Sequence, residues 1–270
     1  MHMTVCIGAL CEDGKSAVVA ADKMVTFGAP MMLQTEPNTF KKIYSLTPEC
    51  VLLFSGSVPD GEQVMALMPA PAAKSQILKI AESAKTAYAQ LKKNRTEETI
   101  LRPLLGLDFA QFQALVGQSS SSQILQQVIG MIMQHNLQLD ILVAGVDDSG
   151  SHLFAITHPG VLMPMDTNGF TAIGSGGLHA AVRLSLGQHT KTATLVETVY
   201  SVYEAKRAAE VAPGVGKLTD MAIIKAGKVH LGDARFFAAL EGVHKERPSL
   251  TDEEKKLLEK ACDECSSDKP

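Results

Sequence analysis

Hydrophobic residues along the chain form three pairs of short runs, and a few turn-forming residues join the members of each pair. In the first pair, TVCIGAL and SAVVAAD are joined by CEDGK, in which Asp13-Gly14 favours a hairpin turn. The second pair, LDILVAGVDDSGSHLFAIT, turns at residues 147–150, and the third, LTDMAIIKAGKVHL, turns at Ala226-Gly227. Because a hairpin joins neighbouring antiparallel strands, this pattern predicts antiparallel sheets.

Helical spacing of hydrophobic residues fills the stretches between these hairpins. Between residues 61 and 94 the spacing is interrupted by MPAPAAK, whose two prolines should end one helix before the next begins. The second of these helices carries a stripe that we interpret as core packing, consisting of Ile77, Ile80, Ala84, Tyr88 and Leu91. SSSSQILQQVIGMIMQHN predicts a serine-capped helix, and its Met, Ile, Leu and Val residues predict deep burial.

The remaining elements complete an alternation of strands and helices. VLLFSG and TNGFTAIGSGG predict single strands, whereas LHAAVRLSL, TLVETVYSVYEAKRAAE and the charged RPSLTDEEKKLLEKACDECSSDKP predict helices. Two groups of helices must cover the faces of two antiparallel sheets, which predicts an α+β fold, a four-layer αββα sandwich. We expect one domain over residues 1–245, with insertions near 65–80 and 95–120, and a charged C-terminal helix and tail over 246–270.

Composition and charge narrow the function classes. The chain has 270 residues, of which 46% are hydrophobic, so a sizeable core can form. A net charge of −4 argues against non-specific binding to nucleic acid or to acidic membranes. No apolar stretch approaches the ~20 residues that a membrane span needs, and no secretory signal pattern is present. We therefore expect a cytoplasmic protein that binds neither membrane nor nucleic acid.

The cysteines and histidines do not form a recognisable metal or disulfide pattern. Five scattered cysteines do not predict a disulfide framework. Cys262 and Cys265 form a C-x-x-C in the polar tail, which we interpret as incidental thiols on a solvated segment rather than as a metal or redox site. The histidines show no metal-ligand spacing, so we expect no metal and no cofactor.

A hydroxyl residue, Thr4, lies close to the start of the chain and runs directly into the first strand. Threonine is a good strand residue, so its position alone needs no further explanation. The alternative is that the chain is cut so that Thr4 becomes residue one, because its α-amine could then take the proton of its own hydroxyl. The first hairpin should return Asp22 to Thr4, and Lys42 could supply positive charge, although Asp22 and Lys42 could equally form a surface ion pair.

Several motifs together carry a family resemblance. TVCIGALCEDG, VVAADKMVTFG, FKKIY, FSGSV, LDILVAGVDDSGSHLFAI and IGSGG follow the proteasome β-subunit pattern in order and approximate spacing, from Thr4 to about Val229. The chain thus resembles the proteasome-like N-terminal nucleophile (Ntn) hydrolases, which include bacterial proteasome-like protease subunits. Each motif is weak alone, whereas the ordered set is specific.

The resemblance implies roles for individual residues. It makes Thr4 the nucleophile, Lys42 the active-site lysine and Asp22 the acid that pairs with this lysine. Gly56 would supply an oxyanion N–H, Thr26 would bind the substrate backbone, and Ser175 would lie near the amine of the nucleophile. A further acid of the family falls near Glu210, where the loop is longer and reads Glu-Val-Ala-Pro-Gly.

An active enzyme of this type requires removal of the residues that precede Thr4. His2 should obstruct trimming by methionine aminopeptidases, which favour small second residues, and the family's usual glycine before the nucleophile is absent. Either the chain cuts itself at Met3–Thr4, or residues 1–2 are a cloning remnant and Met3 is removed.

The resemblance implies an N-terminal threonine endopeptidase that acts on peptides or unfolded proteins. It also implies a ring-shaped homo-oligomer, with an ATP-dependent unfoldase as the partner that such rings suggest. A catalytically inactive ring subunit is one alternative, although such subunits tend to lose the threonine and lysine kept here. A non-proteolytic amidase or transpeptidase with the same amine–hydroxyl device is the other.

Overall fold

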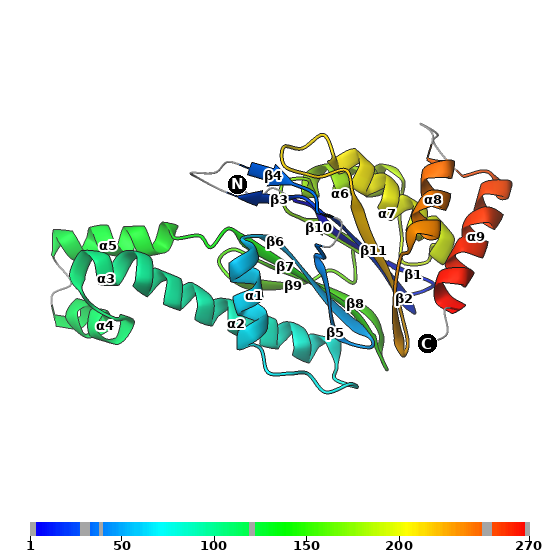
Figure 1. The fold of residues 1–270 in the computed structure, drawn as a ribbon. Coiled ribbons are helices and arrows are strands. Elements are labelled where there is room, and N and C mark those ends of the chain that lie inside the picture. Colours follow the sequence, from blue (N-terminus) through cyan, green and yellow to red (C-terminus); the bar gives the residue numbers. More distant parts are fainter. Residues whose placement is uncertain (1–3, 28–32, 38–39, 119–121, 245–249, 268–270) are drawn as a thin grey trace.

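Two antiparallel sheets form the centre of the molecule (Figure 1). The computed structural model describes residues 4–27, 33–37, 40–118, 122–244 and 250–267. In this part of the chain, both central sheets have five strands. The first sheet has the order β10-β1-β2-β11-β12, and the second sheet has the order β5-β6-β7-β8-β9. The strands are β1 (Cys6–Cys11), β2 (Ser16–Asp22), β5 (Ile43–Thr47), β6 (Cys50–Gly56), β7 (Leu139–Asp147), β8 (Gly150–Thr157), β9 (Val161–Pro164), β10 (Phe170–Ile173), β11 (Thr219–Lys225) and β12 (Lys228–Leu231).

The two sheets pack face to face because successive side chains of each strand point to opposite faces. In β1, Cys6 and Leu10 face the second sheet, whereas Ile7 and Ala9 face the helices outside. β6 alternates in the same way, since Leu53 points into the space between the sheets and Phe54 points to the outer helices. The strands therefore read as continuous hydrophobic runs, because both of their faces are buried.

Helices form the outer layers. α1 (Val58–Leu67) and α2 (Ile77–Thr96) cover the second sheet, and the predicted stripe of α2 is buried there. α6 (Gly177–Leu186) and α7 (Leu195–Ala209) cover the first sheet. The four-layer αββα sandwich expected from the sequence is confirmed. None of the helices described is long and apolar enough to cross a lipid bilayer.

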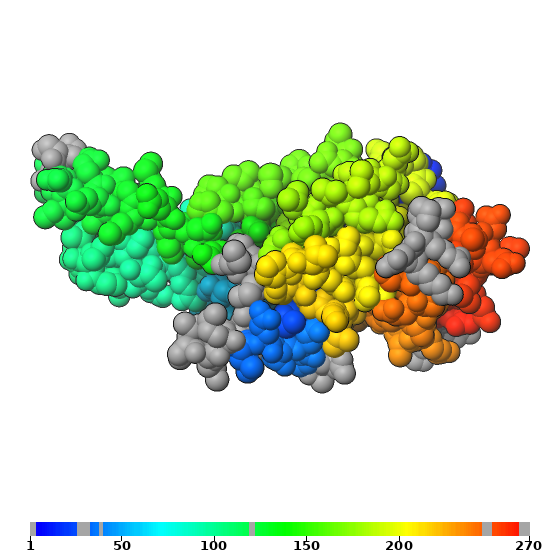
Figure 2. All heavy atoms as spheres, turned by 90° about the horizontal axis from the view of Figure 1, so that it is seen from above, coloured from blue at the N-terminus to red at the C-terminus, as the bar shows by residue number. Residues whose placement is uncertain are grey.

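A helical arm projects from the end of α2, away from the sheets (Figures 1 and 2). It consists of η1 (Glu97–Leu101), α3 (Arg102–Leu105), α4 (Phe109–Gln118) and α5 (Gln123–Gln134), and we call residues 97–134 the arm. The arm has a small core of its own, formed by Ile100, Leu101, Phe112, Leu125 and Val128. Of the insertion expected at 95–120, residues 95–118 are thus mostly helical, and residues 119–120 lie outside the described residues.

The expected deep burial of the helix in 119–136 is wrong. In α5 the buried residues are Leu125 and Val128, whereas Ile124, Met131 and Met133 are exposed. The physical reason is that none of the described sheets lies against the arm, so its short helices shield one face of α5 and leave the other in solvent. Ser122 occupies the N-cap position, but its side chain makes no capping hydrogen bond.

Two C-terminal helices extend the layer on the first sheet. α8 (Ala234–Val243) was not anticipated from the sequence, and α9 (Asp252–Ser267) packs on α7 and α8. Leu258 and Cys262 of α9 belong to the core cluster on this side of the sheet. The interpretation of Cys262 as a solvated thiol is therefore wrong, and the side chain of Cys265 lies outside the described residues.

Candidate active site

The first hairpin and the strand that follows bring the three central residues together. Thr4 directly precedes β1, and Asp22 is the last residue of β2, whose Ala21 pairs with Cys6 of β1. The backbone N–H of Asp22 donates to the Val5 carbonyl at 3.3 Å, which extends the pairing towards Thr4. Lys42 directly precedes β5 of the opposite sheet, so the site lies where the two sheets meet.

Thr4, Asp22 and Lys42 form one buried hydrogen-bonded cluster. Lys42 Nζ donates to Thr4 Oγ1 at 2.5 Å and to Asp22 Oδ1 at 2.9 Å, and Thr4 Oγ1 donates to the same carboxylate oxygen. All three residues are almost fully inaccessible, with exposed fractions of 3% for Thr4, 0% for Asp22 and 4% for Lys42. A charge pair is weakly screened in such surroundings, so the Lys42 ammonium acts strongly on the hydroxyl that it contacts.

Backbone donors hold the Asp22 carboxylate in place. Oδ1 accepts the N–H of Val5 at 2.9 Å, and Oδ2 accepts the N–H groups of Met24 at 2.9 Å and Gly216 at 3.0 Å. These bonds replace the water that a carboxylate loses on burial. Asp22 therefore serves as a fixed anchor for Lys42 rather than as a mobile surface carboxylate, and the surface-pair alternative does not apply.

The turn between β10 and α6 packs against the backbone of Thr4. Thr4 N–H donates to Ser175 Oγ at 3.2 Å, and Gly176 N–H donates to the Thr4 carbonyl at 3.2 Å. Gly174 has φ of +90°, and a Cβ there would lie 2.4 Å from the Thr4 carbonyl oxygen. Only glycine fits this turn, because both its backbone angle and the close approach exclude a side chain. Ser175 thus lies at the nitrogen of Thr4, as the resemblance implies.

Gly56 and Thr26 lie on the elements next to this cluster. Gly56 is the last residue of β6 and has φ of +121°. The residue before it, Ser55, lies next to Gly174: a Cβ added to Gly174 would be 2.7 Å from Ser55 Oγ. Gly56 therefore belongs to the same end of the sandwich as the turn that holds Thr4. Thr26 lies in β3 (Val25–Phe27), which follows Asp22 and pairs with β4 (Leu33–Thr35).

Glu210 takes a place that differs from the one implied by the resemblance. At the C-terminal end of α7, Glu210 Oε1 accepts a hydrogen bond from Lys206 Nζ at 2.7 Å and lies 3.4 Å from Arg207 Nη1. Within the described part of the chain, no hydrogen bond joins Glu210 to Thr4 or Ser175. A role for Glu210 at the amine thus remains a prediction, and the structure places its carboxylate on a lysine.

Lys206 is a residue that sequence reasoning missed. Its side chain is fully buried, and Nζ also donates to the Lys217 carbonyl at 2.5 Å. Burial lowers the pKa of Lys206, and the nearby Glu210 and Asp22 oppose this shift. The Lys217 carbonyl belongs to the loop 211–218, which also contacts the cluster. In this loop, Gly216 N–H donates to Asp22, and the Pro213 carbonyl lies 3.3 Å from Ser175 Oγ. Lys206 is therefore a positioning residue for the loop behind the cluster.

We expect Lys206→Met to lower both stability and activity. The change leaves Glu210 and the Lys217 carbonyl without their buried donor, and breaking such a pair typically lowers the free energy of unfolding by about 3–5 kcal/mol. A looser loop should also lower kcat/KM for peptide hydrolysis by about tenfold, equal to about 1.4 kcal/mol. Urea unfolding and peptide hydrolysis assays measure the two effects.

Arg207→Met is the matched control, because Arg207 contacts the same carboxylate from a partly exposed position on the same helix. It should change the free energy of unfolding by less than about 1 kcal/mol. If Lys206→Met and Arg207→Met had equal stability and equal activity, Lys206 would not be a positioning residue.

The thiol close to the cluster is not an alternative nucleophile. Cys6 lies near Lys42, but burial raises the pKa of its thiol to about 12, so it is not a thiolate nucleophile at neutral pH. No group of three or more His, Cys, Asp or Glu among the described residues could hold a metal ion. The absence of a cofactor stays an expectation.

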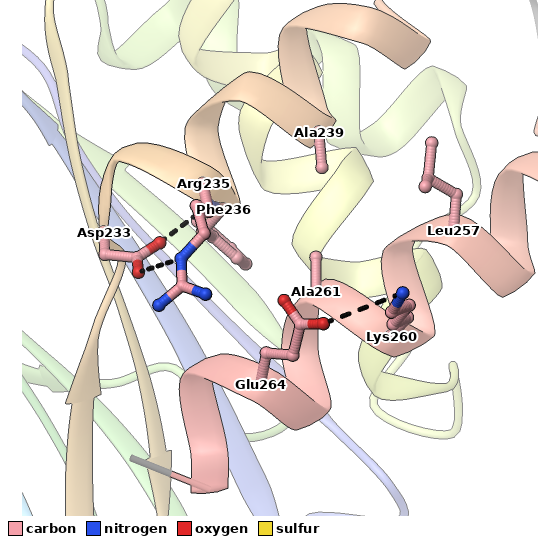
Figure 3. A pocket seen from close by; sticks show the side chains of 8 residues that line it. All are labelled: Asp233, Arg235, Phe236, Ala239, Leu257, Lys260, Ala261 and Glu264. Atoms are coloured by element: carbon pink, nitrogen blue, oxygen red, sulfur yellow. Dashed lines mark hydrogen bonds and ion pairs between the residues drawn. The ribbon is translucent and has the colours of Figure 1, made fainter.

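A pocket lies between α8 and α9, and none of its lining residues belongs to the cluster (Figure 3). It is lined by Asp233, Arg235, Phe236, Ala239, Leu257, Lys260, Ala261 and Glu264. Arg235 lies 3.6 Å from Asp233, and Lys260 lies 3.9 Å from Glu264, so each cation has an acidic neighbour on its own helix or cap. We therefore assign no ligand to this pocket.

Comparison with known proteins supports the resemblance seen in the motifs. The family model described as "Proteasome subunit" matches residues 2–105, which include Thr4, Asp22, Lys42 and Gly56. No match is found among curated proteins. The family resemblance predicted from the sequence is thereby confirmed.

Proposed function

We propose, from the proteasome-like Ntn-hydrolase character of this chain, that it is a threonine peptidase whose nucleophile is Thr4 after removal of residues 1–3. The observation that carries the proposal is the position of Lys42 Nζ, which is bonded at once to Thr4 Oγ1 and to Asp22. The same cluster favours an active enzyme over an inactive ring subunit, because a purely structural subunit does not require a lysine at this hydroxyl.

In the proposed reaction, the amine and hydroxyl of Thr4 act together. Once the peptide bond before Thr4 is cut, its nitrogen becomes an α-amine with a reference pKa of about 7.7–8.0. The amine takes the proton of Oγ1 as this oxygen attacks the scissile carbonyl carbon, and Lys42 stabilises the negative charge that develops on the oxygen. Ser175 Oγ, which lies 3.2 Å from Thr4 N, orients the amine.

The second half of the reaction returns the proton. The amine donates it to the leaving nitrogen of the substrate, and an ester forms between Thr4 Oγ1 and the acyl group. Water, deprotonated by the same amine, then hydrolyses this ester and frees Thr4. In this proposal, the N–H of Gly56 stabilises the oxyanion, and Thr26 binds the substrate backbone next to the site.

We propose that the substrates are peptides or unfolded proteins. We further propose that the chain forms a ring-shaped homo-oligomer in the cytoplasm, with an ATP-dependent unfoldase as the partner that delivers substrates. The ring is supported by the family, whose members assemble in this way. A small-amide substrate would use the same groups, so comparison of rates on an unfolded protein and on small amides separates a protease from an amidase.

The test of the proposal is the chemistry of the chain's first residue. Intact mass and N-terminal sequencing of the purified protein should show Thr4 as residue one. Incubation with a peptide aldehyde or boronate should give one adduct per chain, and peptide mapping after reaction with an irreversible epoxyketone should place it on Thr4. Residues 1–3 still attached and no adduct at Thr4 would contradict the proposal.

A further inference from the structure

The arm carries a long stretch without charge. Residues 109–139 contain no Asp, Glu, Lys or Arg, although these four types make up 20% of the chain. Surface helices ordinarily present charged residues to water, and α9 does so, beginning with Asp252, Glu253 and Glu254. The arm projects into solvent (Figure 2), where charges would be expected if its surface stayed free. Depletion of charge together with exposed methionine is typical of interface cores.

The exposed face of α5 has regular spacing. Ile124, Gln127, Met131 and Gln134 recur at intervals of three and four residues, so they lie on one face of the helix. The exposed fraction is 63% for Ile124 and 50% for Met131. Leu125 and Val128 point the other way, into the core of the arm. The outer face is therefore an exposed stripe of large apolar and amide side chains.

The chemistry of this face indicates its occupant. An amide side chain both donates and accepts, so glutamine complements glutamine, whereas a charged side chain repels its own copy. A face made of Ile, Met and Gln therefore complements itself, as an isologous contact requires. The whole chain carries a net charge of −4, so two copies repel each other in general but not through this face.

We propose that α5 packs against α5 of a second copy of this chain, antiparallel and about a two-fold axis. The arm reaches beyond the sheets, so two arms can meet before the bodies of the two copies approach (Figures 1 and 2). This contact adds a specific surface to the proposed assembly, and it does not depend on the chemistry of Thr4.

The size of the face sets the expected strength of the contact. A helix of 12 residues is about 18 Å long, and two such helices bury less than the roughly 1,200 Å² of a standard stable interface. We therefore expect the contact alone to have a dissociation constant of about a micromolar or weaker, unlike an obligate dimer.

Opposite charges placed on the stripe test the proposal in the full-length protein. Ile124→Glu/Met131→Glu and Ile124→Lys/Met131→Lys should each weaken association at least about tenfold, because like charges meet across the two-fold axis. An equimolar mixture of the two variants should recover association, because each Glu face then meets a Lys face. Sedimentation velocity over a concentration series, with native mass spectrometry of the mixture, measures the distribution of species.

Ala110→Glu/Gln113→Glu on α4 is the matched control, since both residues are exposed and lie on the same arm. It should leave association unchanged, and thermal unfolding should show that all variants keep the fold. Three results would overturn the proposal: a wild-type protein that stays monomeric, charged variants that associate like the wild type, or weakened variants whose mixture does not recover. A wild-type protein that associates as expected but shows no peptidase activity would instead count against the proposed function alone.

Discussion

Thr4→Ala should lower kcat/KM for peptide hydrolysis at least about a thousandfold, because the attacking oxygen is gone while the rest of the site remains. The buried cluster gives the physical reason: Thr4 Oγ1 is the hydroxyl bonded to both Lys42 and Asp22. Thr4→Ser keeps an oxygen at the same position and should retain a substantial part of the activity. Initial rates on a fluorogenic peptide measure both variants.

Thr192→Ala serves as the matched control for this substitution, since Thr192 is exposed and lies outside the cluster. It should leave kcat/KM unchanged. If the Thr4→Ala variant hydrolysed the peptide at the wild-type rate, Thr4 would not be the nucleophile. The proposed function would then be wrong, whereas the description of the fold would still hold.

Lys42→Met should lower both activity and stability. Removal of the ammonium leaves the Asp22 carboxylate buried without its charge partner, which typically lowers the free energy of unfolding by about 3–5 kcal/mol. Loss of the positive charge next to Thr4 Oγ1 should also lower kcat/KM by about a hundredfold or more, as the loss of electrostatic stabilisation does in other hydrolases. Urea unfolding and peptide hydrolysis measure the two effects separately.

The double variant Asp22→Asn/Lys42→Met separates structure from chemistry. With both charges removed, most of the lost stability should return, because no unpaired charge stays buried. Activity should stay as low as in Lys42→Met, since nothing replaces the positive charge at Thr4. Recovery of activity along with stability would mean that Lys42 acts through the fold and not on the hydroxyl.

The strands and their pairing were largely predictable from the sequence. Hairpin turns at Asp13-Gly14, in 147–150 and at Ala226-Gly227 fix neighbouring antiparallel strands locally. The same locality explains why the meeting of Thr4 and Asp22 could be expected, since a single hairpin joins them. The short β3–β4 pair and α8 were missed, because short segments carry too little periodicity to be recognised.

Other features depended on contacts between distant segments. The family resemblance places Ser175 near the amine of Thr4, but local sequence patterns do not. Its hydrogen bond to Thr4 N joins residues far apart in the sequence and depends on the pairing of β1 with β10. Cys262 is buried because α9 packs on α7 and α8. This packing was not expected from the sequence, because α9 is rich in charged residues, which are typical of a solvated helix.

Local turns and an ordered set of motifs specify the alternating pattern of strands and helices, the four-layer architecture and the group of Thr4, Asp22 and Lys42, so these features could be predicted before the fold was known. Two features could be seen only in the folded molecule: Glu210 pairs with the buried Lys206, and α5 exposes its apolar face. Both outcomes depend on which surface lies opposite a helix, and the periodicity of a helix shows that it has an apolar face without showing what covers it.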